Sequence, residues 1–372
     1  MHIQHITLDL RGGGSFRALS NIILNDINND HSVIALRSYG ESYKLIEKKC
    51  KYIMNLTLEN PILDLIRLIK FTLKAKPDVI QTWLYYCDLL GACLKLILRS
   101  KKLVWNIRCT LSNKKQFKFT TNLTIQICAI LSYFFPDKII SCSKKSYIDH
   151  SKIGYFKKKF KVIQNGVDTN VFYPNECLRN SFRKDFKLNN DDFILGMVAR
   201  YDEQKDHKTL LEALSICKNK GYLFKCFLIG SEIDSSNKAL TKHINKFQLR
   251  NDIILCGIRK DLNYFYNGFD FHVLSSKSEG SPNVTLEAMA SGTPCITTDN
   301  GDSREIVSNS GWVCPTDNPM KLAESIEMAF NETNENLVKR KNNAIITIKN
   351  YYSIQKMVKE YEKIYKGIYL KS

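Results

Sequence analysis

The stretch DFHVLSSKSEGSPNVTLEAMASGTPCITT occupies residues 270–298. Its two ends, DFHVL (270–274) and PCITT (294–298), are short apolar runs typical of buried strands. Between them, Ser281 is a favourable N-cap, and Pro282 suits the first helical position, where its missing N–H costs nothing. The stretch therefore predicts a strand, a loop, a helix and a second strand, which is the repeating unit of parallel α/β sheets.

The same alternation of short apolar runs and longer amphipathic segments continues over the whole chain. Segments such as 61–75 and 118–134 have helical spacing, and an Asn-Gly-Val-Asp turn at 165–168 separates two series of strands. The predicted strands are 2–8, 32–36, 78–82, 103–107, 138–142 and 161–164, followed by 193–199, 224–230, 252–257, 270–274 and 294–298. Two Rossmann-like halves of α/β class, followed by a terminal helix, are the simplest architecture.

Length and composition narrow the class of protein further. A chain of 372 residues exceeds one ordinary core, so two domains are expected. The longest apolar runs are interrupted before the roughly 18–20 residues that span a bilayer. The N-terminus shows no charged segment followed by an apolar one, so we expect no signal peptide and a cytoplasmic protein. The twelve cysteines include no C-x-x-C pair, which favours small buried residues over disulfides or a zinc site.

The positive charge is unevenly distributed between the two halves. Residues 1–165 hold 27 Lys and Arg against 11 Asp and Glu, whereas residues 166–372 hold 28 against 26. A general lysine bias explains the total of +18 but not this asymmetry. The first half should therefore attract polyanions or an anionic membrane surface.

Two glutamates flank the helix predicted to start at Ser281. Glu279 precedes it in the loop, beside Gly280, and Glu287 follows on its second turn. The N–H groups at a helix start favour an anion, so each carboxylate can bind hydroxyl groups on one side of that anion. A nucleotide diphosphate-sugar has this layout. A first-turn acid favoured by the helix dipole is the alternative, and it explains Glu287 better than Glu279.

Two further motifs follow predicted strands. Gly12, Gly13 and Gly14 come after the first strand and open a helix, so they form either a plain tight turn or a close backbone contact with a phosphate or sugar. Arg200 and Lys205 come after the strand at 193–199. They are either solvated surface charges or two cations that converge on a diphosphate.

With these motifs, the chain resembles the retaining GT-B glycosyltransferases of family 4, in particular their polysaccharide-assembly branch. The resemblance covers nearly the whole chain, and its E-x7-E pattern is specific. The matching segments are 275–307 with its E-x7-E pattern, 198–213, 164–168 and the glycine loop at 12–14, with 81–91 and 105–108 pointing to that branch.

The resemblance implies two Rossmann-like domains, 1–165 for the acceptor and 166–350 for the donor, that face a central cleft, with a helix at 351–372 returning to the first domain. It implies a hexosyltransferase that uses a nucleotide-diphosphate sugar, with UDP as the expected nucleotide, and needs neither cofactor nor divalent metal. Arg200 and Lys205 would neutralise the diphosphate, and Glu279 would bind the donor sugar. The other implied donor contacts are Gly13, Gly14, Gly257, Ile258, Arg259, Gly280, Ser281, Pro282, Asn283, Val284 and Glu287, where Glu287 binds the ribose and 257–259 touch the base.

On the acceptor side this sequence departs from the family pattern. Family members carry a histidine after the strand represented here by 78–82, but no histidine lies between His31 and His150. Tyr86 or Asp88 could orient the acceptor instead, and Arg108 could hold a phosphate. The expected acceptor is a lipid-linked saccharide, on polyprenyl pyrophosphate, at the cytoplasmic face of an inner membrane.

Two alternatives stay open at this point. A GT-B-like epimerase or phosphorylase would need further acid/base groups or a cofactor lysine, and neither pattern is evident. A nucleic-acid-binding protein could use the basic half and its aromatic-basic segments, but a binding module has no need of the paired glutamates. We therefore expect no nucleic-acid partner.

Overall fold

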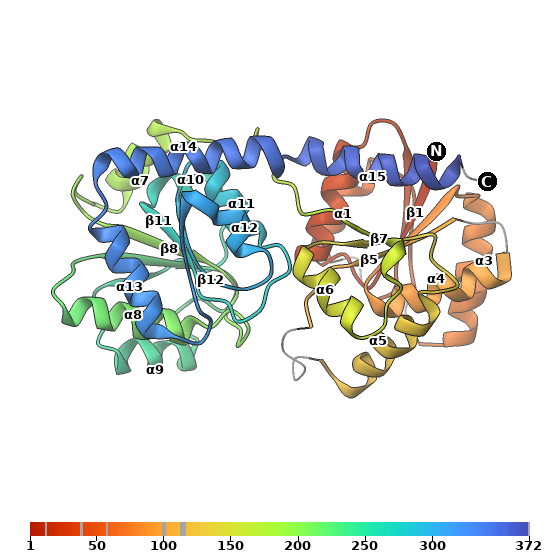
Figure 1. Ribbon diagram of the computed structural model, residues 1–372, viewed down its shortest axis with the longest axis horizontal. Coiled ribbons are helices and arrows are strands. Elements are labelled where there is room, and N and C mark those ends of the chain that lie inside the picture. Colours follow the sequence, from red (N-terminus) through yellow and green to blue (C-terminus); the bar gives the residue numbers. More distant parts are fainter. Residues whose placement is uncertain (12, 38–39, 57–58, 99–101, 112–116, 371–372) are drawn as a thin grey trace. The chain divides into compact units, whose positions relative to one another are not determined.

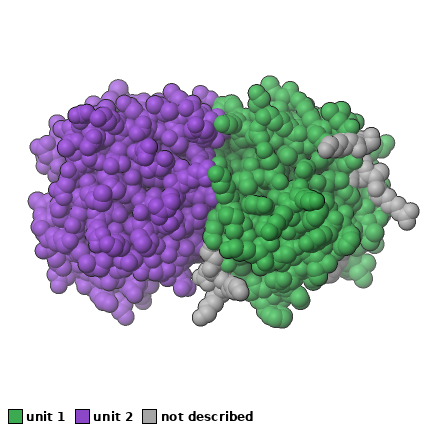
Figure 2. All heavy atoms as spheres, in the orientation of Figure 1, with its two compact units in different colours: residues 1–166, 354–372 green, residues 167–353 purple. Residues whose placement is uncertain are grey.

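The computed structural model describes residues 1–11, 13–37, 40–56, 59–98, 102–111 and 117–370. The chain forms two compact units, residues 1–166 with 354–372 and residues 167–353 (Figure 2). Each unit has one parallel sheet with helices on both faces (Figure 1). The predicted α/β class with two Rossmann-like sheets is confirmed.

The first unit has a seven-stranded sheet in the order β3-β2-β1-β4-β5-β6-β7. Helices α1 and α15 share one core cluster with the sheet, and α3, α4 and α5 share the other. Its strands are β1 (His2–Thr7), β2 (Asp30–Ala35), β3 (Cys50–Asn55), β4 (Val79–Trp83), β5 (Lys102–Ile107), β6 (Lys138–Ser141) and β7 (Phe160–Val162). Its helices are α1 (Gly14–Asn25), α2 (Lys44–Glu47), α3 (Pro61–Ala75), α4 (Tyr85–Leu98), α5 (Phe119–Leu131), α6 (Lys144–Lys152) and α15 (Ile354–Tyr369), with short 3₁₀ turns at Glu41–Tyr43 and Lys157–Lys159.

The second unit has a six-stranded sheet in the order β10-β9-β8-β11-β12-β13. One core cluster lies under α8, α9 and α13, and another under α7, α10, α11 and α14. Its strands are β8 (Ile194–Val198), β9 (Lys225–Ile229), β10 (Ile253–Leu255), β11 (Phe271–Leu274), β12 (Cys295–Thr298) and β13 (Gly311–Cys314). Its helices are α7 (Glu176–Asp185), α8 (His207–Asn219), α9 (Lys238–Lys246), α10 (Leu262–Gly268), α11 (Asn283–Ala290), α12 (Ser303–Val307), α13 (Pro319–Phe330) and α14 (Asn334–Tyr351), with a 3₁₀ turn at Ser308–Ser310.

The terminal helix α15 belongs to the first unit because of its apolar side. Ile354, Met357, Tyr361 and Tyr365 are buried in the cluster that also contains residues of α1. The hydroxyl group of Tyr361 accepts a hydrogen bond from Asn106 at 2.9 Å, and that of Tyr365 donates to Gln81. A segment almost 200 residues away in the sequence thus completes the first core.

The structure differs from the sequence-based predictions at three points. It adds β3 and β13, which were not predicted, and both are edge strands with several half-buried residues, so their apolar signal is weak. It also starts α11 at Asn283 instead of Pro282. Pro282 keeps an extended ψ of 107° and is itself the N-cap, so Ser281 is not the predicted capping residue.

Candidate functional site

The candidate residues lie where the strand order of each sheet changes direction, which is its topological switch point. We call this point the reversal. In the second unit the chain runs from β8 outward to β10, then returns to the other side of β8 with β11. In the first unit the corresponding reversal lies between β1 and β4. Ligands of open parallel sheets bind at the carboxyl ends of the strands at such a point. The loops after β8 and β11 are therefore the first place to examine.

Lys205 and Glu279 meet at the reversal between β8 and β11. The Nζ atom of Lys205 lies 2.5 Å from Oε1 of Glu279, and both side chains are mostly buried. The two residues come from loops 74 positions apart in the sequence. The structure thus brings a predicted diphosphate-binding cation and the predicted sugar-binding acid into one ion pair.

Hydrogen bonds from backbone and side-chain groups hold together the two loops that carry this pair. The N–H of Lys277 donates to the carbonyl of Gln204 at 2.8 Å, and the side chain of Gln204 donates to the carbonyl of Ser278 at 2.5 Å. The hydroxyl group of Ser275 contacts the carbonyls of Lys205 and Asp206 at 3.1 and 2.9 Å. These bonds fix the backbone on both sides of the ion pair, so the positions of Lys205 and Glu279 are set by the fold itself.

Arg200 and His207 lie on either side of Lys205 in the sequence and have different environments. Arg200 is exposed, and its Nε donates to Asp202 at 3.2 Å. His207 is buried at the start of α8, and neither ring nitrogen has a hydrogen-bond partner. Burial, followed by the positive charge of Lys205, lowers the pKa of His207 to about 4. At neutral pH this imidazole is therefore uncharged, and Arg200 and Lys205 are the cations at the end of β8.

The start of α11 presents backbone donors beside Glu279. The first helical bond runs from the N–H of Leu286 to the carbonyl of Pro282 at 3.3 Å, which leaves the N–H groups of Asn283 and Val284 outside the helical ladder. Together with the partial positive charge of a helix start, these groups can receive an anion. Gly280, Ser281 and Pro282 form the short connection from Glu279 to this helix.

Glu287 is placed differently from Glu279. Its side chain is buried on α11, and Oε2 accepts a hydrogen bond from the hydroxyl group of Tyr266 at 3.1 Å. The two glutamates therefore flank the helix start, as predicted, one in a loop and one inside the fold. A hydroxyl group that binds Glu287 would have to reach a carboxylate which Tyr266 already holds.

Gly301 packs against the peptide between Glu279 and Gly280. Its φ is +53°, and a Cβ atom there would lie 2.3 Å from the carbonyl oxygen of Gly280 and 2.5 Å from that of Glu279. The N–H of Asp302 also donates to the carbonyl of Gly280 at 3.3 Å. Sequence reasoning missed Gly301, along with Gln204, Ser275 and Tyr266; the Asp-Asn-Gly turn signal at 299–301 was the only local hint.

Gly257, Ile258 and Arg259 follow β10 at the same edge of the sheet. Gly257 has a φ of +62° and open space where a Cβ would lie. Ile258 is largely exposed, and Arg259 forms a bidentate pair with Asp261 at 2.9 and 2.7 Å. The segment thus offers an exposed apolar side chain, whereas its arginine is already engaged by a carboxylate.

In the first unit, the predicted glycines start α1 after β1. Gly13 is the N-cap with a φ of 90°, and Gly14 is the first residue of the helix. A Cβ at Gly13 would meet no heavy atom within 4 Å, so the backbone there is open to an approaching group. The third glycine of the loop, Gly12, lies outside the described residues.

The three residues proposed for the acceptor side differ in accessibility. The half-buried Tyr86 contacts Thr120 and Thr121 through its hydroxyl group at 3.2 and 3.1 Å, and these bonds lower its pKa. The expectation for Asp88 is not supported, because its side chain is fully buried, accepts a bond from Thr82 and has a pKa raised by burial well above the usual range. A buried carboxyl group of this kind cannot orient an acceptor directly.

Arg108, the cation predicted for the acceptor side, lies just after the end of β5. One Nη atom donates to Asn165, and the guanidinium lies 5.8 Å from the centre of the Trp83 ring. Its Nε and other Nη are buried without a hydrogen-bond acceptor, near the hydroxyl group of Tyr361. Arg108 is thus held among interior groups of the first unit, including Tyr361, and its contact with an acceptor phosphate stays a prediction.

A buried histidine lies just after the end of β4 in the folded first unit. His150 from α6 reaches the hydroxyl group of Tyr85, just after β4, at 2.7 Å. It is fully buried, its other nitrogen bonds the carbonyl of Ser146 at 2.7 Å, and burial lowers its pKa to about 4. His150 therefore has a packing role.

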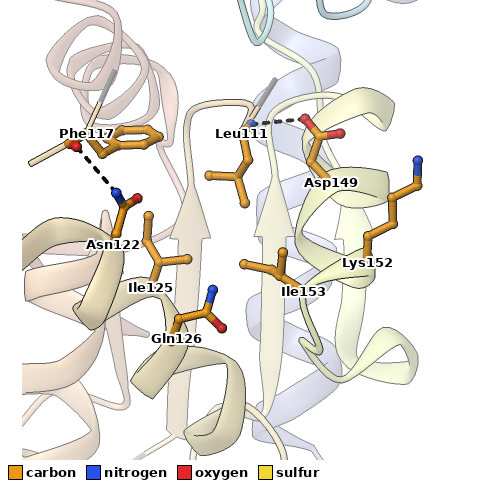
Figure 3. Close-up of a pocket in the computed structure, with 8 residues that line it drawn as sticks. All are labelled: Leu111, Phe117, Asn122, Ile125, Gln126, Asp149, Lys152 and Ile153. Carbon is orange, nitrogen blue, oxygen red and sulfur yellow. Dashed lines mark hydrogen bonds between the residues drawn. The ribbon is translucent and has the colours of Figure 1, made fainter. Parts of the chain in front are cut away.

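A cavity of about 480 Å³ lies between α5 and α6 in the first unit (Figure 3). Apolar side chains face one another across it, and polar side chains lie along its edges. The lining residues are Leu111, Phe117, Asn122, Ile125, Gln126, Asp149, Lys152 and Ile153. The carboxylate of Asp149 accepts a hydrogen bond from the N–H of Leu111 at 3.0 Å, so this polar group of the lining already has a partner. None of the predicted site residues lines this cavity.

Two further searches covered the described residues only. Within them, no three His, Cys, Asp or Glu side chains gather where they could hold a metal ion. None of the described helices combines the length and apolar character needed to cross a membrane. The twelve cysteines, all of them in described segments, form no disulfide.

Comparison with known proteins connects this geometry to an enzyme family. Residues 179–347 match the family model "Glycosyl transferases group 1". This part of the chain is therefore similar to that family. The matched segment contains the point between β8 and β11 where the strand order changes direction, with Arg200, Lys205, Glu279 and Glu287.

Individual relatives agree with the domain match over longer stretches. The capsular polysaccharide biosynthesis glycosyltransferase CapM of Staphylococcus aureus is 23% identical over 87% of this chain and 84% of its own length. An Escherichia coli UDP-Gal:alpha-D-GlcNAc-diphosphoundecaprenol alpha-1,3-galactosyltransferase is 25% identical over 68% of this chain and 66% of its own length. Anabaena HepE, solved in complex with UDP, has a TM-score of 0.87 at 20% identity and covers 99% of this chain and 100% of its own. These findings support a GT-B glycosyltransferase.

Proposed function

We propose that the protein is a retaining hexosyltransferase of the family 4 type. It moves a hexose or N-acetylhexosamine from a UDP-sugar to a lipid-linked saccharide during the biosynthesis of a bacterial surface polysaccharide. The observation that carries the proposal is the Lys205–Glu279 ion pair beside the start of α11, at the reversal between β8 and β11. The relatives named above act in capsule assembly or on a diphosphoundecaprenol-linked sugar, as their names state.

In this proposal the donor diphosphate binds between the cations after β8 and the N–H groups of α11. The bond between the anomeric carbon and the phosphate oxygen breaks, and negative charge develops on the leaving UDP. Arg200 and Lys205 stabilise that charge, with the helix start supplying further positive potential. The hydroxyl oxygen of the acceptor bonds to the anomeric carbon on the same face and passes its proton to the phosphate oxygen that leaves.

The ion pair assigns Glu279 a second task besides binding the sugar. Without a donor, its carboxylate neutralises Lys205, which otherwise would be a mostly buried single cation. When a diphosphate arrives, Lys205 exchanges a carboxylate for a phosphate, and Glu279 is released toward the sugar hydroxyl groups. Donor binding thereby frees the carboxylate of Glu279 to form hydrogen bonds with the sugar.

The remaining contacts extend the proposal over both units. Glu287 binds the ribose and residues 257–259 the base, while Gly13 and Gly14 contact the donor from the first unit. Arg108, and with it Tyr86, serves the pyrophosphate or saccharide of the acceptor. No divalent metal is required, so EDTA should leave turnover unchanged. The basic first half holds the enzyme peripherally on the cytoplasmic face of the inner membrane.

A thermal-shift panel of UDP, GDP and their sugars tests the donor assignment. We expect stabilisation by UDP and a further, sugar-dependent shift with one UDP-sugar. Glu279→Ala should keep the shift with UDP and lose discrimination among sugars, whereas the exposed neighbour variant Glu203→Ala should retain both. An unchanged sugar preference in Glu279→Ala would refute the role of this glutamate. Stabilisation by RNA but not by UDP would refute the proposed function.

A further inference from the structure

Helix α5 exposes apolar side chains on the side that faces solvent. Its thirteen residues contain no charged residue. Phe119, Leu123, Ile127 and Ile130, followed by Phe134, recur every three or four positions, and their exposed fractions lie between 37% and 82%. We call these five residues the α5 strip. The opposite side of the helix, with Ile125 and Cys128, is buried in the core, so α5 is apolar on both sides.

Elements that contact α5 or its end also carry exposed apolar and basic side chains. At the end of α4, which packs against α5, Leu96 and Ile97 are also largely exposed. Lys159 donates to the carbonyls of Ser132 and Tyr133 at 3.1 and 2.8 Å, which ties the 3₁₀ turn at Lys157–Lys159 to the end of α5. The lysines of this turn therefore lie beside the strip, and Lys157 and Lys158 are exposed.

The positive charge of the chain is concentrated in the same part of the sequence. Residues 89–165 contain sixteen Lys and Arg but only two acidic residues, Asp137 and Asp149, a balance of +14 out of +18 for the whole chain. Both aspartates are neutralised by lysines, Asp137 by Lys95 at 2.6 Å and Asp149 by Lys145 at 2.9 Å. No such excess exists in residues 1–88, where eleven basic residues face nine acidic ones.

We propose that the α5 strip inserts into the surface of an anionic lipid bilayer, with Lys157 and Lys158 contacting lipid head groups. A surface helix that is apolar toward solvent and flanked by lysines has the layout of an interfacial helix. A protein partner fits less well, because protein interfaces are depleted in lysine at their centres and a cationic rim requires an acidic partner surface. Contiguous exposed apolar side chains without such a partner would otherwise promote aggregation.

This inference rests on the proposed function only for its purpose, since a lipid-linked acceptor is reached at a membrane. It goes beyond a general attraction of the basic half, because it requires apolar insertion at one helix. Charge alone would give binding that salt abolishes, since raising the ionic strength shortens the screening length. Insertion of the strip predicts a component of binding that remains at high salt.

Co-sedimentation of the full chain with vesicles tests the proposal. The vesicles contain phosphatidylcholine with or without phosphatidylglycerol. The wild type should bind only the anionic vesicles tightly. The triple variant Leu123→Gln/Ile130→Gln/Phe134→Gln should bind them roughly a hundredfold more weakly, and Lys157→Gln/Lys158→Gln about twentyfold more weakly, with a flatter dependence on salt. All five side chains are exposed, so the fold is retained.

Matched controls come from the second unit. Leu223→Gln/Met320→Gln/Met328→Gln removes three other exposed apolar side chains, and Lys238→Gln/Lys242→Gln removes two other exposed lysines. Neither should change vesicle binding. Unchanged binding of the strip variant would overturn the proposal. So would concentration-dependent self-association of the wild type that the strip variant abolishes, because the strip would then bind a second copy.

Release of UDP from UDP-sugar in the absence of vesicles separates this inference from the proposed function. The strip variant should release UDP like the wild type. If the wild type releases UDP but does not bind vesicles, only the proposed membrane contact is wrong. If the wild type binds vesicles but neither binds nor releases UDP, only the proposed function is wrong.

Discussion

The two units have the same three-layer plan, but their surfaces and sites differ. In both sheets the order in which strands are added changes direction beside the first strand, β1 or β8. Loops from the carboxyl ends of the strands lie at that point. In residues 166–372 the charges nearly balance, and the reversal holds a cation and an acid paired at 2.5 Å. In residues 1–165 the charge is +16, and the cation at the sheet edge, Arg108, has guanidinium nitrogens without an acceptor.

In the proposed function, this difference lets one fold serve two tasks. A paired Lys–Glu site can exchange its internal partner for a charged ligand and is suited to a donor that binds and leaves in every cycle. An arginine with unused donors and a basic, apolar surface is suited to a large anionic partner. The following predictions test this division of labour, from the largest expected effect to the smallest.

Replacing either cation after β8 should have the largest effect. Lys205→Ala or Arg200→Ala should lower kcat by about 10²–10³, because each removes a stabilising charge from the leaving diphosphate. Initial rates of UDP release measure this effect. Lys208→Ala changes an exposed lysine of α8 and should stay within about twofold of the wild type. If Lys205→Ala were as active as this control, the second unit would not be the donor side.

Acid should destabilise both units through buried, neutral histidines. His150 in the first unit and His207 in the second have a pKa of about 4 because of burial, whereas an unfolded histidine titrates near 6.5. As the pH falls below 6.5, these two histidines become protonated in the unfolded chain but stay neutral in the folded chain. The stability that these two histidines contribute is therefore complete above pH 6.5 and falls until about pH 4, by up to about 3 kcal/mol per histidine.

Urea unfolding at a series of pH values measures this loss. His150→Gln and His207→Gln should each flatten the profile between pH 6.5 and 4, and the effect should be local to one unit when followed by hydrogen exchange. The more exposed His243 offers a control, since His243→Gln should leave the profile nearly unchanged. A wild-type stability that is constant over this range would contradict the prediction.

Gly301→Ala should distort the donor loop. The new Cβ would clash with the carbonyl oxygens of Glu279 and Gly280 at 2.5 and 2.3 Å. Gly221→Ala is the matched control, because its φ of +90° is also positive but no heavy atom lies within 4 Å. The control should lose about 1 kcal/mol of unfolding free energy from the backbone alone, and Gly301→Ala a further amount of about 1–3 kcal/mol.

Sugar discrimination in the thermal-shift panel should fall in Gly301→Ala but not in Gly221→Ala, because only the first displaces Glu279. Equal losses of stability in the two variants would show that the loop accommodates the methyl group. In that case Gly301 would not position Glu279.

Arg108→Ala should have the smallest and most selective effect. It should lower transfer to a lipid-linked acceptor about tenfold, as expected for one charged hydrogen bond, while UDP release to water stays unchanged. Lys70→Ala, an exposed lysine elsewhere in the first unit, is the control for loss of charge. An equal fall in acceptor-dependent and acceptor-independent rates would assign Arg108 to the donor side or to folding, and would remove the contrast between the units.

The sequence by itself determined the alternation of strands and helices and the loops in which candidate residues lie. Glu279 before the helix and Glu287 on its second turn were predictable, since proline and the apolar spacing mark the helix locally. The edge strands β3 and β13 were not, because half-exposed strands carry a weak apolar signal. The exact start of α11 was also missed, since ψ of Pro282 depends on the loop before it.

Only the tertiary structure decided which of these residues meet. It joined Lys205 to Glu279 across 74 positions, pressed Gly301 against the same loop, and buried Asp88, which the sequence had offered as an accessible acid. The sequence also could not say which side of α5 faces solvent, because two opposite sides are apolar and no charged residue of the helix marks the exposed one. Long-range packing chose that side, and with it the surface proposed to contact the membrane.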